Sequence, residues 1–198
     1  MGKHLKKFND EQEFIDYKNS DNFITPNVSL IKNKRTMAYT PISKKYLICK
    51  YNATEEGYMS LYNGNLPVSE MIVDGVRLNE PITYYYFTPG IHTVKLAIKN
   101  DYHAIEYLAF LGQTNLISIE IPDFITYIAD NVFNGCTSLQ EIICWNTVSP
   151  KIGSNGVFLD VPENGVLKIP AGSIIGVYTD YDMYDTLRSI KWWVIENF

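Results

Sequence analysis

The chain has 198 residues, of which 46% are hydrophobic and 20% are charged, a composition typical of a folded globular protein rather than a disordered or fibrous one. Its 17 basic residues are outnumbered by 22 acidic ones, giving a formal net charge of −5. Because proteins that bind phosphate backbones usually show a basic face and none is visible here, we expect no nucleic-acid partner.

The first predicted region, residues 1–44, is an N-terminal arm with a short amphipathic helix over 8–20. Asn9 or Asp10 can cap that helix, and Phe14 and Tyr17 lie three residues apart on one face. Pro26 favours an extended chain after it. Since the arm carries little core of its own, we expect it to become ordered on a partner.

The start of the chain bears on localisation. Lys3, Lys6 and Lys7 are followed by the polar stretch 9–13 instead of an apolar segment, so we predict no signal peptide. No run of about 18 apolar residues is present, and membrane insertion is not expected. Two alternatives remain open: the signal was removed and a Met-Gly start added, or the protein never uses the secretory route.

The second predicted region, residues 45–104, is a small antiparallel β-sandwich-like module. Strands are expected over 46–51, 70–73, 82–87 and 92–98. Asp74-Gly75 between apolar runs predicts a hairpin turn, and the last run alternates apolar and polar residues as a half-buried strand does.

The run Tyr84-Tyr85-Tyr86 supplies the candidate binding residues. Tyr84 and Tyr86 should share one strand face and Tyr85 the other, so one side would expose tyrosine. An exposed tyrosine pair suits contact with protein or carbohydrate, whereas the alternative is packing between coils, subunits or sheet faces.

The third predicted region, residues 105–198, is self-similar. Phe110, Gly112, Thr114 and Leu116 recur 23 residues later as Phe133, Gly135, Thr137 and Leu139. A further step of 25 carries the pair Ile142 and Cys144 onto Leu167 and Ile169. Such a period predicts stacked β-coils with Ile, Leu and Phe pointing inward and Gly135 permitting the tight turn. About two and a half coils are expected.

Residues 119–139 resemble the repeat of BspA-like leucine-rich-repeat proteins, with the family's Pro, Ile, Phe, Cys and Leu positions filled by Pro122, Ile128, Phe133, Cys136 and Leu139. Ala129 and Val132 depart slightly from the usual Gly and Ala. The segment from Leu167-Lys-Ile-Pro170 to the tryptophans is similar to the family's closing segment. The resemblance therefore implies a short leucine-rich-repeat β-solenoid with a C-terminal helix cap over about 105–198, in a mainly β chain.

The N-terminal arm resembles the openings of virion proteins encoded by Bacteroidetes phages and prophages, on the evidence of residues 3–8 and 24–29. This resemblance implies a virion location and a role in capsid decoration, a fibre or a tail. The alternative is a secreted BspA-like cell-surface adhesion protein that binds host protein or glycan. In either case the partners are proteins or surface glycans, and homo-oligomers are plausible.

No catalytic constellation can be assembled. Cys49, Cys136 and Cys144 have no metal-ligand spacing and are interpreted as buried thiols, and the histidines lie far apart in the sequence. The acidic stretch 180–185 fails the calcium-loop pattern, because position six is Asp185 and position twelve is Trp192. We therefore predict no enzyme activity, no cofactor and no metal.

Overall fold

The computed structural model describes residues 5–6, 37–38, 46–173, 183–190 and 193–198, in two units, Met1–Lys45 and Tyr46–Phe198. In the first unit, β1 (Leu5–Lys6) pairs antiparallel with β2 (Met37–Ala38). The helix predicted over 8–20 lies outside the described residues. The predicted region boundaries at 44 and 104 remain predictions.

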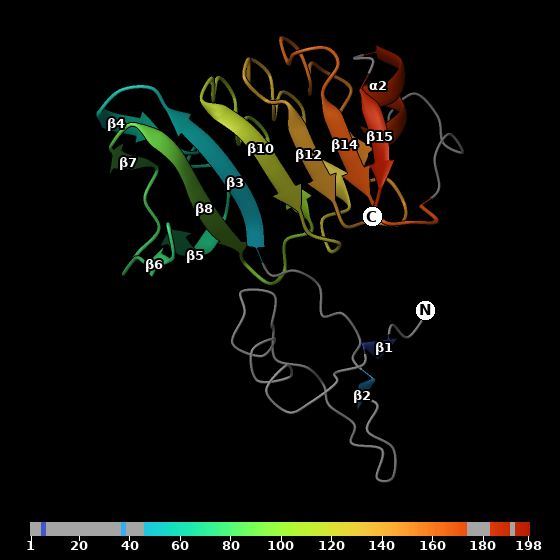
Figure 1. The fold of residues 1–198 in the computed structure, drawn as a ribbon, viewed down its shortest axis with the longest axis horizontal. Helices are drawn as coiled ribbons and strands as arrows, with labels where there is room; N and C mark the ends of the chain where they lie inside the picture. The colour runs from blue at the N-terminus through green and yellow to red at the C-terminus, as the bar shows by residue number, and fades with distance from the viewer. Residues whose placement is uncertain (1–4, 7–36, 39–45, 174–182, 191–192) are drawn as a thin grey trace. The chain divides into compact units, whose positions relative to one another are not determined.

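An eight-stranded mixed sheet runs through the second unit in the order β15-β14-β12-β10-β3-β8-β5-β6 (Figure 1). Its strands in chain order are β3 (Tyr46–Ala53), β5 (Val68–Val73), β6 (Val76–Arg77), β8 (Gly90–Ile98), β10 (Leu116–Ile121), β12 (Glu141–Cys144), β14 (Val166–Ile169) and β15 (Val194–Asn197). The first four strands of the sheet order are parallel, whereas β3, β8, β5 and β6 are antiparallel. Because β3 pairs directly with β10, the strands of the predicted sandwich-like module continue the repeat sheet.

Three short strands form the second side of the repeats. β9 (Ala104–Ile105), β11 (Tyr127–Ile128) and β13 (Lys151–Ile152) make a parallel sheet, and each one precedes a strand of the large sheet in the chain. The segments β9–β10, β11–β12 and β13–β14 are therefore three full coils of a β-solenoid. The expectation of two and a half coils was too low.

The interior of the solenoid is filled as the repeat pattern predicts. Leu116, Ile119, Ile121 and Phe133 are all fully buried. Three phenylalanine rings, one per coil, stack in a column: Phe110 and Phe133 have centroids 5.7 Å apart, and Phe133 and Phe158 are 5.6 Å apart. This column joins the coils through their shared core, since no single coil can bury its apolar edge alone.

A left-handed residue follows each phenylalanine by two positions. Gly112 has φ 69°, Gly135 has φ 74°, and Asp160 occupies the same place in the third coil with φ 58°. A Cβ on Gly135 would lie 3.3 Å from Gly112 Cα, so the coils also approach closely here. The predicted role of Gly135 in a tight turn is confirmed, because this φ strains residues that carry a Cβ.

The last coil is closed by both a helix and a strand. α2 (Met183–Ile190) contributes Met183, Tyr184 and Leu187 to the core, and the Tyr184 hydroxyl donates to Asn146 O at 2.6 Å. The sheet edge beyond β14 is taken by β15, which the sequence analysis did not predict. A helix alone would not close the coil, because without β15 the outer edge of β14 would keep unpaired backbone groups.

Candidate functional site

Two strands outside the large sheet present the predicted tyrosines. β4 (Gly57–Ser60) and β7 (Tyr84–Phe87) pair antiparallel, with Tyr58 opposite Tyr86 and Ser60 opposite Tyr84. Strand β7 begins two residues later than predicted. Alternation along the pair places Tyr58, Tyr84 and Tyr86 on one side, and we call these three residues the tyrosine face.

The tyrosine face is open to solvent. Tyr58 is 78% exposed, Tyr84 61% and Tyr86 49%. Tyr85 points to the other side and packs against Phe87, which is buried. The sequence pattern therefore placed Tyr84 and Tyr86 on one strand face correctly, and their role in binding stays a prediction.

Two contacts organise this face. The Tyr58 and Tyr86 rings meet edge to face, with centroids 5.2 Å apart and planes at 78°. The Tyr86 hydroxyl donates a hydrogen bond of 3.0 Å to Glu56 Oε1, and this bond raises the pKa of Tyr86 above its ordinary value. Both contacts restrict the rings before any partner arrives, which lowers the entropy lost on binding.

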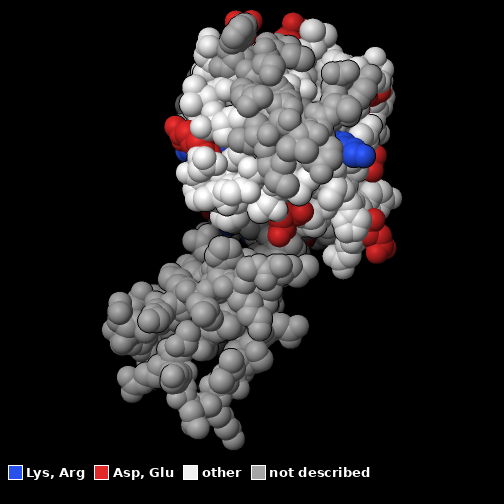
Figure 2. Space-filling view, turned by 90° about the vertical axis from the view of Figure 1, so that its right-hand side faces the viewer, with Lys and Arg blue, Asp and Glu red and all other residues white. Residues whose placement is uncertain are grey.

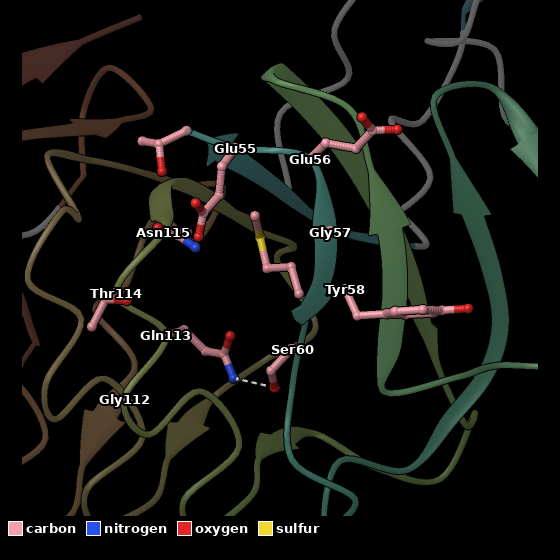
Figure 3. A pocket seen from close by; sticks show the side chains of 11 residues that line it. Glu55, Glu56, Gly57, Tyr58, Ser60, Gly112, Gln113, Thr114 and Asn115 are labelled. Carbon is pink, nitrogen blue, oxygen red and sulfur yellow. Dashed lines mark hydrogen bonds between the residues drawn. The ribbon is translucent and has the colours of Figure 1, made fainter.

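A hollow of about 260 Å³ lies on the other flank of β4, between that strand and the turn of the first coil. Its lining comes from residues 54–60 and 112–115. Figure 3 shows Glu55, Ser60 and Gln113 around this hollow, whereas Glu56 and Tyr58 extend away from it. Tyr58 also belongs to the lining, so the hollow adjoins the tyrosine face at β4.

Gln113 connects the first coil to β4. It is only 6% exposed, and its Nε2 donates to Ser60 Oγ at 2.9 Å. The sequence did not predict this contact, because Ser60 and Gln113 are 53 positions apart. It did not predict the exposed Tyr58 either, because the four-residue strand β4 is too short to show a clear period.

Within the described part of the chain, the Cys136 thiol donates to Phe110 O and the Cys144 thiol to Asn146 Oδ1. Cys49, Cys136 and Cys144 are buried and free, as predicted. Burial is the main cause that raises the pKa of Cys49 and Cys136 to about 12 and that of Cys144 to about 11. A thiol that stays protonated at neutral pH is a poor nucleophile, so these residues serve packing.

We expect the native chain to react with Ellman's reagent at pH 8 roughly 100-fold more slowly than the chain in guanidinium, where three thiols should be counted. The folded-state pKa values lie above the ordinary 9.0. The stability that the buried, protonated thiols provide is therefore complete below pH 9 and is lost as the pH rises toward about 11–12. The urea midpoint should fall between pH 8 and pH 10.5. A thiol that reacts at the denatured rate in the native protein would contradict this assignment.

The described histidines hold turns in place. His92 Nδ1 lies 2.7 Å from Asp74 Oδ2, and its Nε2 lies 2.8 Å from Thr88 O. Burial lowers the pKa of His92, but the bonds to Asp74 and Thr88 outweigh it and leave the pKa raised. His103 Nδ1 contacts Phe124 O at 3.2 Å. Among the described residues, no group of three or more potential ligands could hold a metal ion.

The described surface adds two observations on partners. Figure 2 shows one side of the molecule, on which the described acidic and basic side chains are scattered and the basic ones do not gather. No helix within the described part of the chain is long and apolar enough to cross a membrane. Residues 180–182 of the acidic stretch lie outside the described residues.

Comparison with known proteins identifies the repeats. A family model described as "BspA type Leucine rich repeat region (6 copies)" matches residues 77–162. No curated protein and no solved structure matches the chain. The matched residues include the first two coils and most of the turn of the third, and they begin ahead of β9 with β7 and β8. Residues 77–162 are therefore a BspA-type leucine-rich repeat region, whose part from β9 onward is folded as a β-solenoid.

Proposed function

We propose that this chain is a non-catalytic adhesion protein that uses the tyrosine face to bind a protein or glycan at a cell surface. The observation that carries the proposal is the solvent exposure of Tyr58, Tyr84 and Tyr86 on one face. Tyrosine supplies a large rigid contact area with a hydroxyl for hydrogen bonding, and it is enriched at protein interfaces.

The BspA-type repeats support the same function, since leucine-rich repeats typically serve binding rather than catalysis. They also favour the adhesion alternative over the virion hypothesis, because the match is to the BspA-type repeat that this alternative names. On this proposal the protein acts outside the cell, where its partner is displayed.

The test is a binding screen of the full chain against a glycan array and a panel of purified extracellular glycoproteins. The test variant is Tyr84→Ser with Tyr86→Ser, and the matched control is Tyr102→Ser with Tyr127→Ser, two exposed tyrosines on other segments. We expect at least one ligand to be retained and its affinity to fall about tenfold or more in the test variant only. An empty screen, or equal binding by both variants, would overturn the proposal.

A further inference from the structure

The hollow beside β4 is rich in hydrogen-bond acceptors and holds no cation of its own. Its lining includes Glu55 and Glu56, of which Glu56 accepts the hydrogen bond from Tyr86, and it contains no lysine, arginine or histidine. Figure 3 shows Glu55 extending toward the hollow. An anionic ligand would therefore meet like charge there, whereas a cation would meet a carboxylate.

A second observation points to a ligand. The Gln113 side chain is about nine-tenths buried, and its Nε2 is bonded to Ser60 Oγ. Its Oε1 accepts no hydrogen bond from any described residue, and Figure 3 shows this oxygen turned into the hollow. No fully enclosed side-chain oxygen or nitrogen lacks a partner in the described structure, so Oε1 is not fully enclosed. Because the bond from Nε2 to Ser60 Oγ fixes the Gln113 side chain, its Oε1 is already positioned to accept a hydrogen bond from a ligand.

The remaining lining fits a side chain better than a free ion. Met59 also lines the hollow and gives apolar surface against which an aliphatic stem can pack. No described group of carboxylates, cysteines or histidines is placed to hold a metal ion. Lysine and arginine both combine an apolar stem with a charged donor head.

We propose that the hollow receives the cationic side chain, guanidinium or ammonium, of a protein partner. Glu55 supplies the opposite charge, and Gln113 Oε1 accepts a hydrogen bond from the same head group. A partner chain lying across β4 would contact both the hollow and the tyrosine face. This inference rests on the proposed binding function and specifies the class of partner as a protein with an exposed basic residue.

The experiment is an NMR titration of the full chain with four probes. They are acetyl-Gly-Arg-Gly-amide, acetyl-Gly-Lys-Gly-amide, the neutral acetyl-Gly-Gln-Gly-amide, and lactose. The readouts are the backbone amides of Gly57 and Asn115 and the side-chain amide of Gln113. We expect saturable shifts at these groups with at least one cationic peptide, in the millimolar range because a single contact is weak, and reduced by 0.5 M NaCl.

The matched variants are Glu55→Gln, which removes the charge in the hollow, and Glu163→Gln, which removes an exposed charge on the third coil. The Kd of the cationic peptide should rise about fivefold or more in Glu55→Gln and stay unchanged in Glu163→Gln. Three outcomes would overturn the inference: no shift with either cationic peptide, equal shifts with the neutral peptide or lactose, or an unchanged Kd in Glu55→Gln.

Failure of this inference can be told apart from failure of the proposed function. The Tyr84 and Tyr86 double variant leaves the lining of the hollow intact, so it should bind the cationic peptide as the wild type does. If that variant loses its surface ligand while the peptide titration is empty, only the cation site is wrong. If the peptide binds the hollow while the tyrosine variant keeps its surface ligand, only the tyrosine face is wrong.

Discussion

Replacing Phe133 with alanine is expected to destabilise the Tyr46–Phe198 unit by about 3–5 kcal/mol. Phe133 is fully buried at the centre of the phenylalanine column, with a stacked ring on each side at 5.7 Å and 5.6 Å. The substitution removes the transfer energy of the ring, leaves a cavity between two coils, and breaks both stacking contacts. Urea unfolding followed by circular dichroism at 25 °C measures the change.

The neighbouring rings supply the controls. Phe110→Ala and Phe158→Ala each remove a ring that stacks on one side only within this column, so each should cost less than Phe133→Ala by about 0.5–1.5 kcal/mol. Phe133→Leu keeps an apolar side chain in the same place and should cost the least of the Phe133 substitutions. A cost below about 1 kcal/mol for Phe133→Ala would show that the coils are not joined through this column.

The column also shows how far the repeat could be read from the sequence. Phe110 and Phe133 were found because Gly112 and Thr114 recur at the same spacing. Phe158 was missed, although its ring completes the stack. The step from Phe133 to Phe158 is two residues longer than the step from Phe110 to Phe133, and Asp160 stands where the other coils have glycine. The inward-facing residues are preserved while the turn residue changes. The third coil therefore shares few identical residues with the other two at equivalent positions.

The pairing of the sheet could not be inferred from local pattern. The strand-like run over 46–51 and the alternation over 92–98 correctly indicated strands, and the structure extends them to β3 and β8. That β3 lies antiparallel to β10, with Cys49 opposite Ile119, depends on contacts between distant parts of the chain. Alternation of apolar and polar residues identifies the buried face of a strand, but it does not identify the strand that pairs with it. Which strand of the module would join the repeat sheet therefore could not be predicted, although one sheet runs through both.

The residues of the candidate site also differ in whether they could be predicted from local sequence pattern. The shared face of Tyr84 and Tyr86 follows from alternation within one strand, so the sequence was sufficient. Tyr58 joins them only through the register of β4 with β7. The hollow requires the turn of the first coil to approach β4, and the Gln113–Ser60 bond holds these segments together. Sites assembled from separate segments need the fold before they can be recognised.

Gly165 and Trp193 provide the second large effect, at the end of the solenoid. Trp193 is 2% exposed, and its indole Nε1 donates to Pro162 O at 2.9 Å. A Cβ on Gly165 would lie 2.4 Å from Trp193 Cε2, 2.5 Å from Cζ2 and 2.8 Å from Gln140 O. The indole therefore occupies the space that a side chain at Gly165 would need. We expect Gly165→Ala to cost about 1–3 kcal/mol by overpacking, and Trp193→Ala to cost about 3–5 kcal/mol.

A double-mutant cycle tests whether the two effects share one cause. In the Trp193→Ala background, the contact with the indole is gone and only the approach to Gln140 O remains, so Gly165→Ala should cost at least 1 kcal/mol less than it does alone. Gly64→Ala is the matched control, because a Cβ there meets nothing within 4 Å and the effect on unfolding should stay within about 0.5 kcal/mol. Urea unfolding of the four chains gives the coupling energy. Additive costs would mean that Trp193 does not fill the space above Gly165, and that the last coil is closed by β15 and α2 without it.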